Sequence, residues 1–225
     1  MDHIKEERTK TMEEKKQATL FSVDPQDFLG RHKEYARSLV DGDPRSPYVI
    51  NTSVLKSPQS AVLVSHTPEK EFVFGLLKHA EYIEAWIKSP DKGFYSLDYE
   101  YWKGGKDRVR RSFNPDFFIV QSVSKLIELA RKENQTEKLN KLRKLEEEGI
   151  EQIVRVVEIK SDEDENETIA AKEQAGKVHF EALSAKLTTA NPGNFSAAAR
   201  PYLNQHYTFD LLRPSGFSAW FREIF

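Results

Sequence analysis

The hydrophobic positions between residues 67 and 88 recur at the spacing of an α-helix. Thr67 is a suitable N-cap, and Pro68 follows at the first helical position, where its missing N–H costs nothing. Ser89-Pro90 ends the segment, whose apolar stripe consists of Phe72, Val73, Leu76, Ala80 and Ile83. Glu69 falls at the start of this inward-facing stripe. The pattern predicts an amphipathic helix that opens a folded domain at about residue 65.

Three later runs are rich in aromatic and β-branched residues, which favours strands. They are GFYSLDYEYW (93–102), SFNPDFFIV (112–120) and EQIVRVVEIK (151–160). The connection at 103–111 contains Gly104-Gly105, a pair that suits a hairpin turn. We therefore expect the first two strands to pair antiparallel.

Helical spacing returns at 122–149, where leucines recur and Asn134-Gln135 marks a break. This predicts a helical hairpin inserted between the second and third strands. A helix at about 167–186 and a strand at about 206–212 follow. The order of helix, three strands, helix and strand predicts an α/β sandwich in which helices flank a central mixed sheet.

The two ends of the chain differ in pattern. Residues 1–18 alternate acidic and basic side chains, which predicts a charged, disordered arm, and 19–64 is a mixed covering segment broken by prolines. The main domain is expected at 65–225. Within it, the segment 217–225 places its aromatic side chains on one helical face. That face either docks on the core or forms an apolar patch for a partner or a second copy.

Composition narrows the class of protein. The chain has 225 residues, of which 38% are apolar and 31% charged, and a net charge of −2. DNA binding would therefore need local basic patches. No apolar run is long enough to span a membrane, and the first residues contain no apolar core of a secretory signal. With no cysteine in the sequence, disulfides and thiolate-bound zinc are excluded, and we expect a cytoplasmic location.

The strand at 151–160 ends in a pattern that carries candidate chemistry. Side chains alternate faces along a strand, so Glu158 and Lys160 point the same way, after an apolar run that predicts burial. Asp116 lies at the Pro-Asp of the preceding strand. Two carboxylates make an oxygen-rich site that Mg²⁺ accepts, and such an ion would activate water and polarise a phosphate. The alternative is a turn at Asp116 and an ordinary solvated strand end.

The runs WIKSPDKGFYSLDY (86–99), FNPDFFIV (113–120) and VVEIK (156–160) together resemble the PD-(D/E)XK nucleases. The similarity is to the C-terminal endonuclease domain of type III restriction enzymes and related helicase-nucleases. It implies a restriction-endonuclease-like fold, Mg²⁺ with Mn²⁺ as a substitute, and cleavage of DNA. It also implies that Asp116, Glu158 and Lys160 are catalytic, with the carbonyl of Ile159 as a further metal ligand. The connection between the Asp116 and Glu158 strands is longer than is usual in that family.

The resemblance also implies an acidic residue from the preceding helix, for which Glu69 is the first choice and Glu71 the second. The alternative is that Glu69 only stabilises the helix dipole. Candidate DNA contacts are Lys103, Lys106, Arg108, Arg110 and Arg111 in the hairpin and Lys172 and Gln174 on the following helix, each with simple solvation as the alternative. The acidic run 161–168 is expected to be a loop beside the site.

DNA is the expected partner, with a separate ATP-dependent motor or specificity subunit and a homodimer as further candidates. The chain contains no recognisable P-loop of its own. Two other functions fit the same sequence. One is a noncatalytic DNA-binding or assembly module of this fold, and the other is an RNA- or single-strand-directed nuclease.

Overall fold

The computed structural model describes residues 48–50, 56–59, 61–64, 66–90, 94–164 and 167–225. The chain divides between Ile50 and Asn51, and the central sheet and helices belong to the unit Asn51–Phe225. The predicted arm at 1–18 and most of the predicted covering segment lie outside the described residues. Within that segment, the described parts form two short strands, β1 (Tyr48–Ile50) and β2 (Ala61–Leu63).

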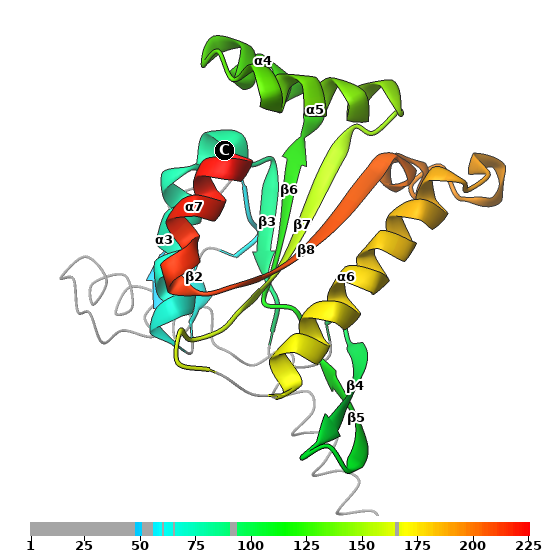
Figure 1. The fold of residues 1–225 in the computed structure, drawn as a ribbon. Helices are drawn as coiled ribbons and strands as arrows, with labels where there is room; N and C mark the ends of the chain where they lie inside the picture. The colour runs from blue at the N-terminus through cyan, green and yellow to red at the C-terminus, as the bar shows by residue number, and fades with distance from the viewer. Residues whose placement is uncertain (1–47, 51–55, 60, 65, 91–93, 165–166) are drawn as a thin grey trace, which may run out of the picture. The chain divides into compact units, whose positions relative to one another are not determined.

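A four-stranded mixed sheet forms the centre of the unit (Figure 1). β6 is antiparallel to both β3 and β7, whereas β7 and β8 are parallel and are joined by a helical crossover. Five α-helices accompany the sheet in the described residues, which confirms the predicted mixed α/β class. In order across the sheet, the strands are β3 (Ala85–Lys88), β6 (Phe117–Ser122), β7 (Gln152–Ile159) and β8 (Gln205–Leu212).

One face of the sheet is covered by α3 (Thr67–Lys78) and α7 (Pro214–Ile224). Phe72 is fully buried, and its ring centroid lies 4.9 Å from that of Phe117 on β6 and 5.2 Å from that of Phe221 on α7. A Cβ at Gly75 would lie 2.2 Å from the Phe221 ring, so glycine permits this close approach. The aromatic segment at the C-terminus is therefore a core-docking helix, as the first of the two interpretations predicted.

The opposite face is covered by α6 (Glu167–Thr188), which matches the helix predicted at about 167–186 and extends two residues further. Phe180 of α6 stacks on Phe209 of β8 with ring centroids 6.0 Å apart. These rings belong to a buried cluster that includes Leu97 and Phe113 from the β4–β5 hairpin. The cluster fixes the base of the hairpin against the sheet, next to the segment that carries Asp116.

The hairpin differs from the prediction in its second strand. β4 (Leu97–Lys103) pairs with β5 (Asp107–Phe113) through a turn in which Gly104 and Gly105 have φ of 58° and 69°, as the glycine pair indicated. However, most of the expected connection at 103–111 is strand, and the expected strand at 112–120 is divided between β5 and β6. The two form separate sheets because Pro115 offers no N–H to a ladder.

The first predicted helix is shorter than its apolar stripe suggested. α3 ends at Lys78, a 3₁₀ turn follows at Ala80–Tyr82, and the segment expected to complete the helix is strand β3. Trp86 in β3 is buried and lies opposite Ile119 of β6. Pairing with a strand about 30 residues away decided this conformation, which helical periodicity could not reveal.

The helical hairpin between β6 and β7 is confirmed. It consists of α4 (Val123–Lys132) and α5 (Thr136–Glu147), and Asn134 between them has φ of 57°. Figure 1 shows the pair lying across one end of the sheet. Shorter 3₁₀ segments, Pro192–Asn194 and Arg200–Asn204, connect α6 to β8.

Candidate active site

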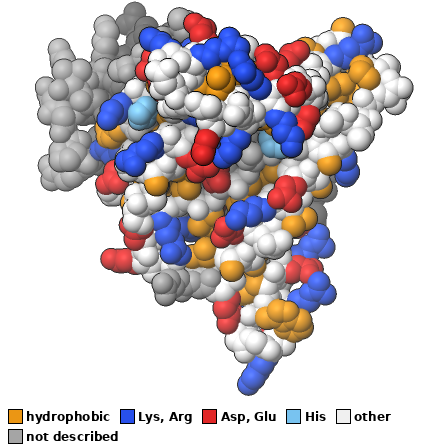
Figure 2. Space-filling view, turned by 45° about the horizontal axis from the view of Figure 1, so that its top comes forward, with side chains coloured by type: hydrophobic (Ala, Val, Ile, Leu, Met, Phe, Trp, Pro, Cys, Tyr) orange, Lys and Arg blue, Asp and Glu red, His pale blue; other side chains and the backbone are white. Residues whose placement is uncertain are grey.

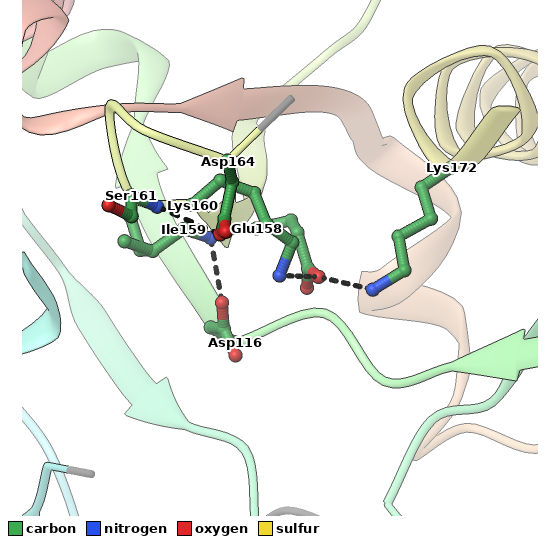
Figure 3. A network of polar contacts seen from close by, with 7 residues as sticks. All are labelled: Asp116, Glu158, Ile159, Lys160, Ser161, Asp164 and Lys172. Atoms are coloured by element: carbon green, nitrogen blue, oxygen red, sulfur yellow. Dashed lines mark hydrogen bonds and ion pairs between the residues drawn. The ribbon is translucent and has the colours of Figure 1, made fainter. Parts of the chain in front are cut away.

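The register between β6 and β7 places Asp116 beside Glu158. Phe117 pairs with Val157, and one further step along both strands brings Asp116 opposite Glu158. Directly opposed side chains in an antiparallel pair lie on the same face with Cβ atoms about 5 Å apart. Asp116 is held there by its Oδ2, which accepts a 2.7 Å hydrogen bond from the N–H of Ile159 (Figure 3). The two predicted carboxylates are therefore neighbours.

Two lysines converge on the Glu158 carboxylate, which is 3% exposed (Figure 3). The Nζ of Lys160 lies 2.7 Å from Oε1, and the Nζ of Lys172 lies 3.1 Å from the same atom. Lys172 reaches across from α6, with its Nζ 5.1 Å from the ring centroid of Phe113. The prediction that Glu158 and Lys160 share a face is confirmed, and Lys172 joins them.

A third carboxylate enters from the first turn of α3. Glu69 is buried, and its Oε2 lies 3.5 Å from the Nζ of Lys88 on β3. Glu71, the second choice, is exposed and does not line the cavity described below. Glu69 is therefore more than an exposed partner of the helix dipole, because its side chain takes part in a buried ion pair at the edge of the site.

Glu69, Asp116 and Lys160 line a cavity of about 650 Å³, and Glu158 lies beside it without lining it. The predicted acidic loop after β7 contributes Asp164 to it, as expected for a loop beside the site. The cavity has the size of a small-molecule or substrate cleft, and polar groups dominate its wall. Its principal lining residues are His66, Glu69, Ser89, Asn114, Asp116 and Lys160.

The charges in this cluster shift the pKa values of its members. Burial, together with the negative charges of Glu158 and Glu69, raises the pKa of Asp116 to about 7, although the bond from the Ile159 N–H opposes the shift. Burial opposes the charged form of Lys160, but contact with Glu158 outweighs it and raises the pKa of the ammonium group. Lys160 therefore stays protonated and serves as a cation and a donor, not as a base.

One atom of the cluster remains without a partner. Oε2 of Glu158 is buried and accepts no hydrogen bond from the described residues. A buried carboxylate oxygen without a partner is costly, and a raised pKa at the neighbouring Asp116 reports the same excess of negative charge. Both observations fit a hard cation held by oxygen. Among the described residues, no group of three or more acidic, histidine or cysteine side chains surrounds a single point, so an ion here would keep several waters, as Mg²⁺ does.

The predicted DNA contacts are only in part brought to the site. Lys103 and Lys106 stand at the hairpin tip, but Arg108 and Arg110 form exposed cross-strand ion pairs with Glu100 and Asp98. Arg111 lies opposite Tyr99, nearer the hairpin base. Gln174 is exposed on α6, and neither Gln174 nor Lys172 lines the cavity, although Lys172 contacts Glu158.

Two residues of the site were not found from the sequence. Lys88 is the buried last residue of β3, and its Nζ lies over the ring of Phe117. Ser89 lines the cavity, and its buried hydroxyl has no partner in the described residues. A lysine directly after Trp86-Ile87 was a possible signal, because a charge inside an apolar strand requires a partner. It was hidden by the assignment of this segment to a helix.

The chain shows no significant similarity to any protein-family model, curated protein or solved structure. Its site is therefore interpreted from its own geometry. None of the helices in the described part of the chain combines the length and the apolar character that crossing a membrane requires.

Proposed function

We propose that this protein is a Mg²⁺-dependent endonuclease of the PD-(D/E)XK kind, with a restriction-endonuclease-like fold. One observation carries the proposal: Asp116 and Glu158 end neighbouring strands on one face, and Lys160 contacts Glu158 beside an open polar cavity. The order of elements, with a helix before the sheet and a helical crossover between two parallel strands, supports the same fold class.

Asp116 and Glu158 would hold the ion, with the Ile159 carbonyl as a third ligand and Mn²⁺ as a substitute. The ion would supply Lewis acidity toward the phosphate and lower the pKa of water. Lys160, protonated and fixed by Glu158, would donate to the attacking water and orient it toward phosphorus. Glu69 would hold a water at the cavity edge, and its carboxylate would remain paired with Lys88.

Lys172 also contributes to the proposed site, through its contact with Glu158. With Lys160 it places two ammonium groups on one oxygen of the buried Glu158 carboxylate, which offsets the cost of burying that charge. In the proposed complex, both ammonium groups would lie near the phosphate. They would offset charge that develops on its oxygens during hydrolysis.

The substrate side of the proposal rests on the hairpin. Exposed Trp102 and the lysines at 103 and 106 lie at its tip, where they would contact a nucleic-acid backbone and an unstacked base. The face seen in Figure 2 carries basic and acidic side chains interspersed, which agrees with the net charge of −2 and with binding through local contacts. DNA is the proposed substrate. Competition between duplex DNA, single-stranded DNA and RNA would identify the preferred form.

Cleavage of supercoiled plasmid tests the function directly. The wild-type protein is expected to nick DNA with Mg²⁺ or Mn²⁺, and Asp116→Asn and Lys160→Met are expected to abolish it. Lys177→Met is the matched control, because Lys177 sits on α6 in an exposed pair with Glu173. Equal nicking by the wild type and both site variants would refute the assignment.

A noncatalytic DNA-binding module of the same fold is the second candidate. It is favoured by the near balance of the cluster, in which Lys88, Lys160 and Lys172 accompany three carboxylates. Such a network can be purely structural. Calorimetric titration with Mg²⁺ separates the two candidates: binding that Asp116→Asn removes supports the nuclease. Salt-sensitive DNA binding without any Mg²⁺ affinity supports the module.

A further inference from the structure

A second cavity, of about 640 Å³, lies beneath the helical hairpin, near the end of β7 opposite to Ile159, and shares no lining residue with the first cavity. Arg155 is three residues before Glu158 on β7, so the alternation of side chains directs it to the opposite face. The cavity is bounded by α4, α5, β7, β8 and α7, and Figure 1 shows these elements meeting at one end of the sheet. It is therefore separate from the candidate active site.

The N-terminus of α5 opens into this cavity. Gln135, Thr136, Glu137 and Lys138 all line it, and the Gln135 side chain forms no N-cap hydrogen bond. The first N–H groups of a helix have no partner within it and carry the positive end of the helix dipole. In the described residues, the amides of Glu137 and Lys138 receive no cap from elsewhere.

Two residues that line the cavity carry buried side-chain donors. The Nζ of Lys138 and the Oγ1 of Thr208 are both inaccessible to solvent, and neither has a hydrogen-bond partner in the described residues. Arg155 also lines the cavity, and its Nε donates a 2.7 Å hydrogen bond to Oε1 of buried Gln121. A buried ammonium without a partner is as costly as a buried carboxylate without one.

The charge of the lining favours an anion. Lys138, Lys141, Arg155 and Arg222 face two carboxylates, Glu137 and Glu223. Burial, with the nearby charge of Arg155, lowers the pKa of Lys138, and burial likewise lowers the pKa of Arg155. The charges of Glu133 and Glu223 oppose the lowering of the Lys138 pKa, and those of Asp210 and Glu223 oppose it at Arg155, but burial outweighs them.

We propose that this cavity binds a phosphate group, carried by a small molecule, between the N-terminus of α5, Lys138, Thr208 and Arg155. Phosphate suits the site because its several acceptor oxygens match donors that converge from three elements. The apolar part of the wall, formed by Leu126, Leu142, Leu145 and Ile153, leaves room for the body of a phosphate monoester. This binding is independent of the proposed nuclease activity.

Calorimetry on the full chain, without divalent ions, tests the proposal. The probes are inorganic phosphate, a nucleoside 5′-monophosphate, the unphosphorylated nucleoside, and chloride at matched ionic strength. We expect both phosphate compounds to bind, and the nucleoside and chloride not to bind. Tighter binding of the monophosphate identifies a phosphate ester as the ligand, whereas equal affinities identify free phosphate.

Lys138→Met should weaken phosphate binding by at least about tenfold, and Thr208→Val by a few fold. Lys144→Met is the matched control, because Lys144 is exposed on the same helix and does not line the cavity. Asp116→Asn should leave phosphate binding unchanged, which separates this site from the proposed nuclease site.

A direct readout accompanies the variants. Phosphate should shift the amide resonances of Glu137 and Lys138 in the wild-type protein, which requires no substitution to fold. The proposal is overturned if chloride and phosphate act alike. It is also overturned if Lys138→Met and Lys144→Met bind phosphate equally, or if the two amide resonances stay in place.

Discussion

The two cavities lie toward opposite ends of β7, and a buried atom without a hydrogen-bond partner belongs to a carboxylate beside one and to an ammonium group at the other. At the ends of β6 and β7, a buried oxygen of Glu158 has no partner in the described residues, and the pKa of Asp116 is raised to about 7. Beneath α5, the unpartnered atom is the Nζ of Lys138, whose pKa is lowered. Burial acts against the charged form in both places, so the direction of each pKa shift follows the sign of the group.

The two cavities therefore call for different ligands. Oxygen atoms of fixed carboxylates suit a hard cation, whereas amide, ammonium and hydroxyl donors suit an oxyanion. Three lysines also pair with Glu69 and Glu158 in the first site, which an enzyme acting on phosphates could use and a protein that only binds a cation would not need.

Glu158→Gln should reduce Mg²⁺-dependent cleavage by about a thousandfold or more, because it removes one of two charged ligands and the anchor of Lys160. Initial rates of plasmid nicking measure the effect. Glu173→Gln on α6 is the control, since this carboxylate pairs only with Lys177 in the described ion pairs. A Glu158→Gln protein that cleaves at the wild-type rate would remove Glu158 from the mechanism.

Asp116→Asn should stabilise the metal-free protein at pH 8 by about 1–3 kcal/mol. The pKa of this acid is raised from 3.8 to about 7 on folding, so burying its charge costs nothing below about pH 4, where it is protonated in both states. The cost grows as the pH rises toward 7, and it is complete above that value. Urea unfolding at pH 4, 6 and 8 measures it.

The difference between variant and wild type should therefore vanish near pH 4 and be largest at pH 8. Saturating Mg²⁺ should reverse the order at pH 8, because only the wild type binds the ion. A variant that is less stable than the metal-free wild type at every pH would show that Asp116 is a structural partner of the Ile159 N–H alone.

A crossed ligand experiment should separate the two cavities by melting temperature. Mg²⁺ is expected to raise the melting temperature of Lys138→Met but not of Asp116→Asn, and phosphate is expected to do the reverse. Shifts of about 3–6 °C correspond to ligand at roughly ten to a hundred times its dissociation constant. If either ligand stabilises all the variants equally, the contrast between the cavities is wrong.

Lys106→Ala should lower the slope of log binding constant against log salt concentration by about 1 for nonspecific duplex DNA, because it removes one phosphate contact. Fluorescence anisotropy at several salt concentrations measures the slope. Arg110→Ala is the matched control on the same hairpin, since Arg110 pairs with Asp98 and releases fewer counterions. Equal slopes for the wild type and Lys106→Ala would show that DNA does not contact Lys106 at the hairpin tip.

Local pattern was sufficient for the central elements of the sheet. The apolar run ending at Ile159 predicted β7, and the leucines at 122–149 predicted the α4–α5 hairpin. The patterns at about 167–186 and 206–212 predicted α6 and β8. Strand alternation also placed Glu158 and Lys160 on one face. Each of these features depends on residues close together in the chain, so the sequence alone determined them.

Long-range pairing decided the rest. β3 is a strand because it pairs with β6. The predicted strand at 112–120 is divided at Pro115 into β5 and β6, which belong to different sheets. The position of Lys88 against Glu69 and of Lys172 against Glu158 depends on how helices pack on the sheet. The cavity beneath α5 gathers residues from five elements, none with a motif of its own. Burial and convergence of charges are properties of packing, so only the tertiary structure could bring them into view.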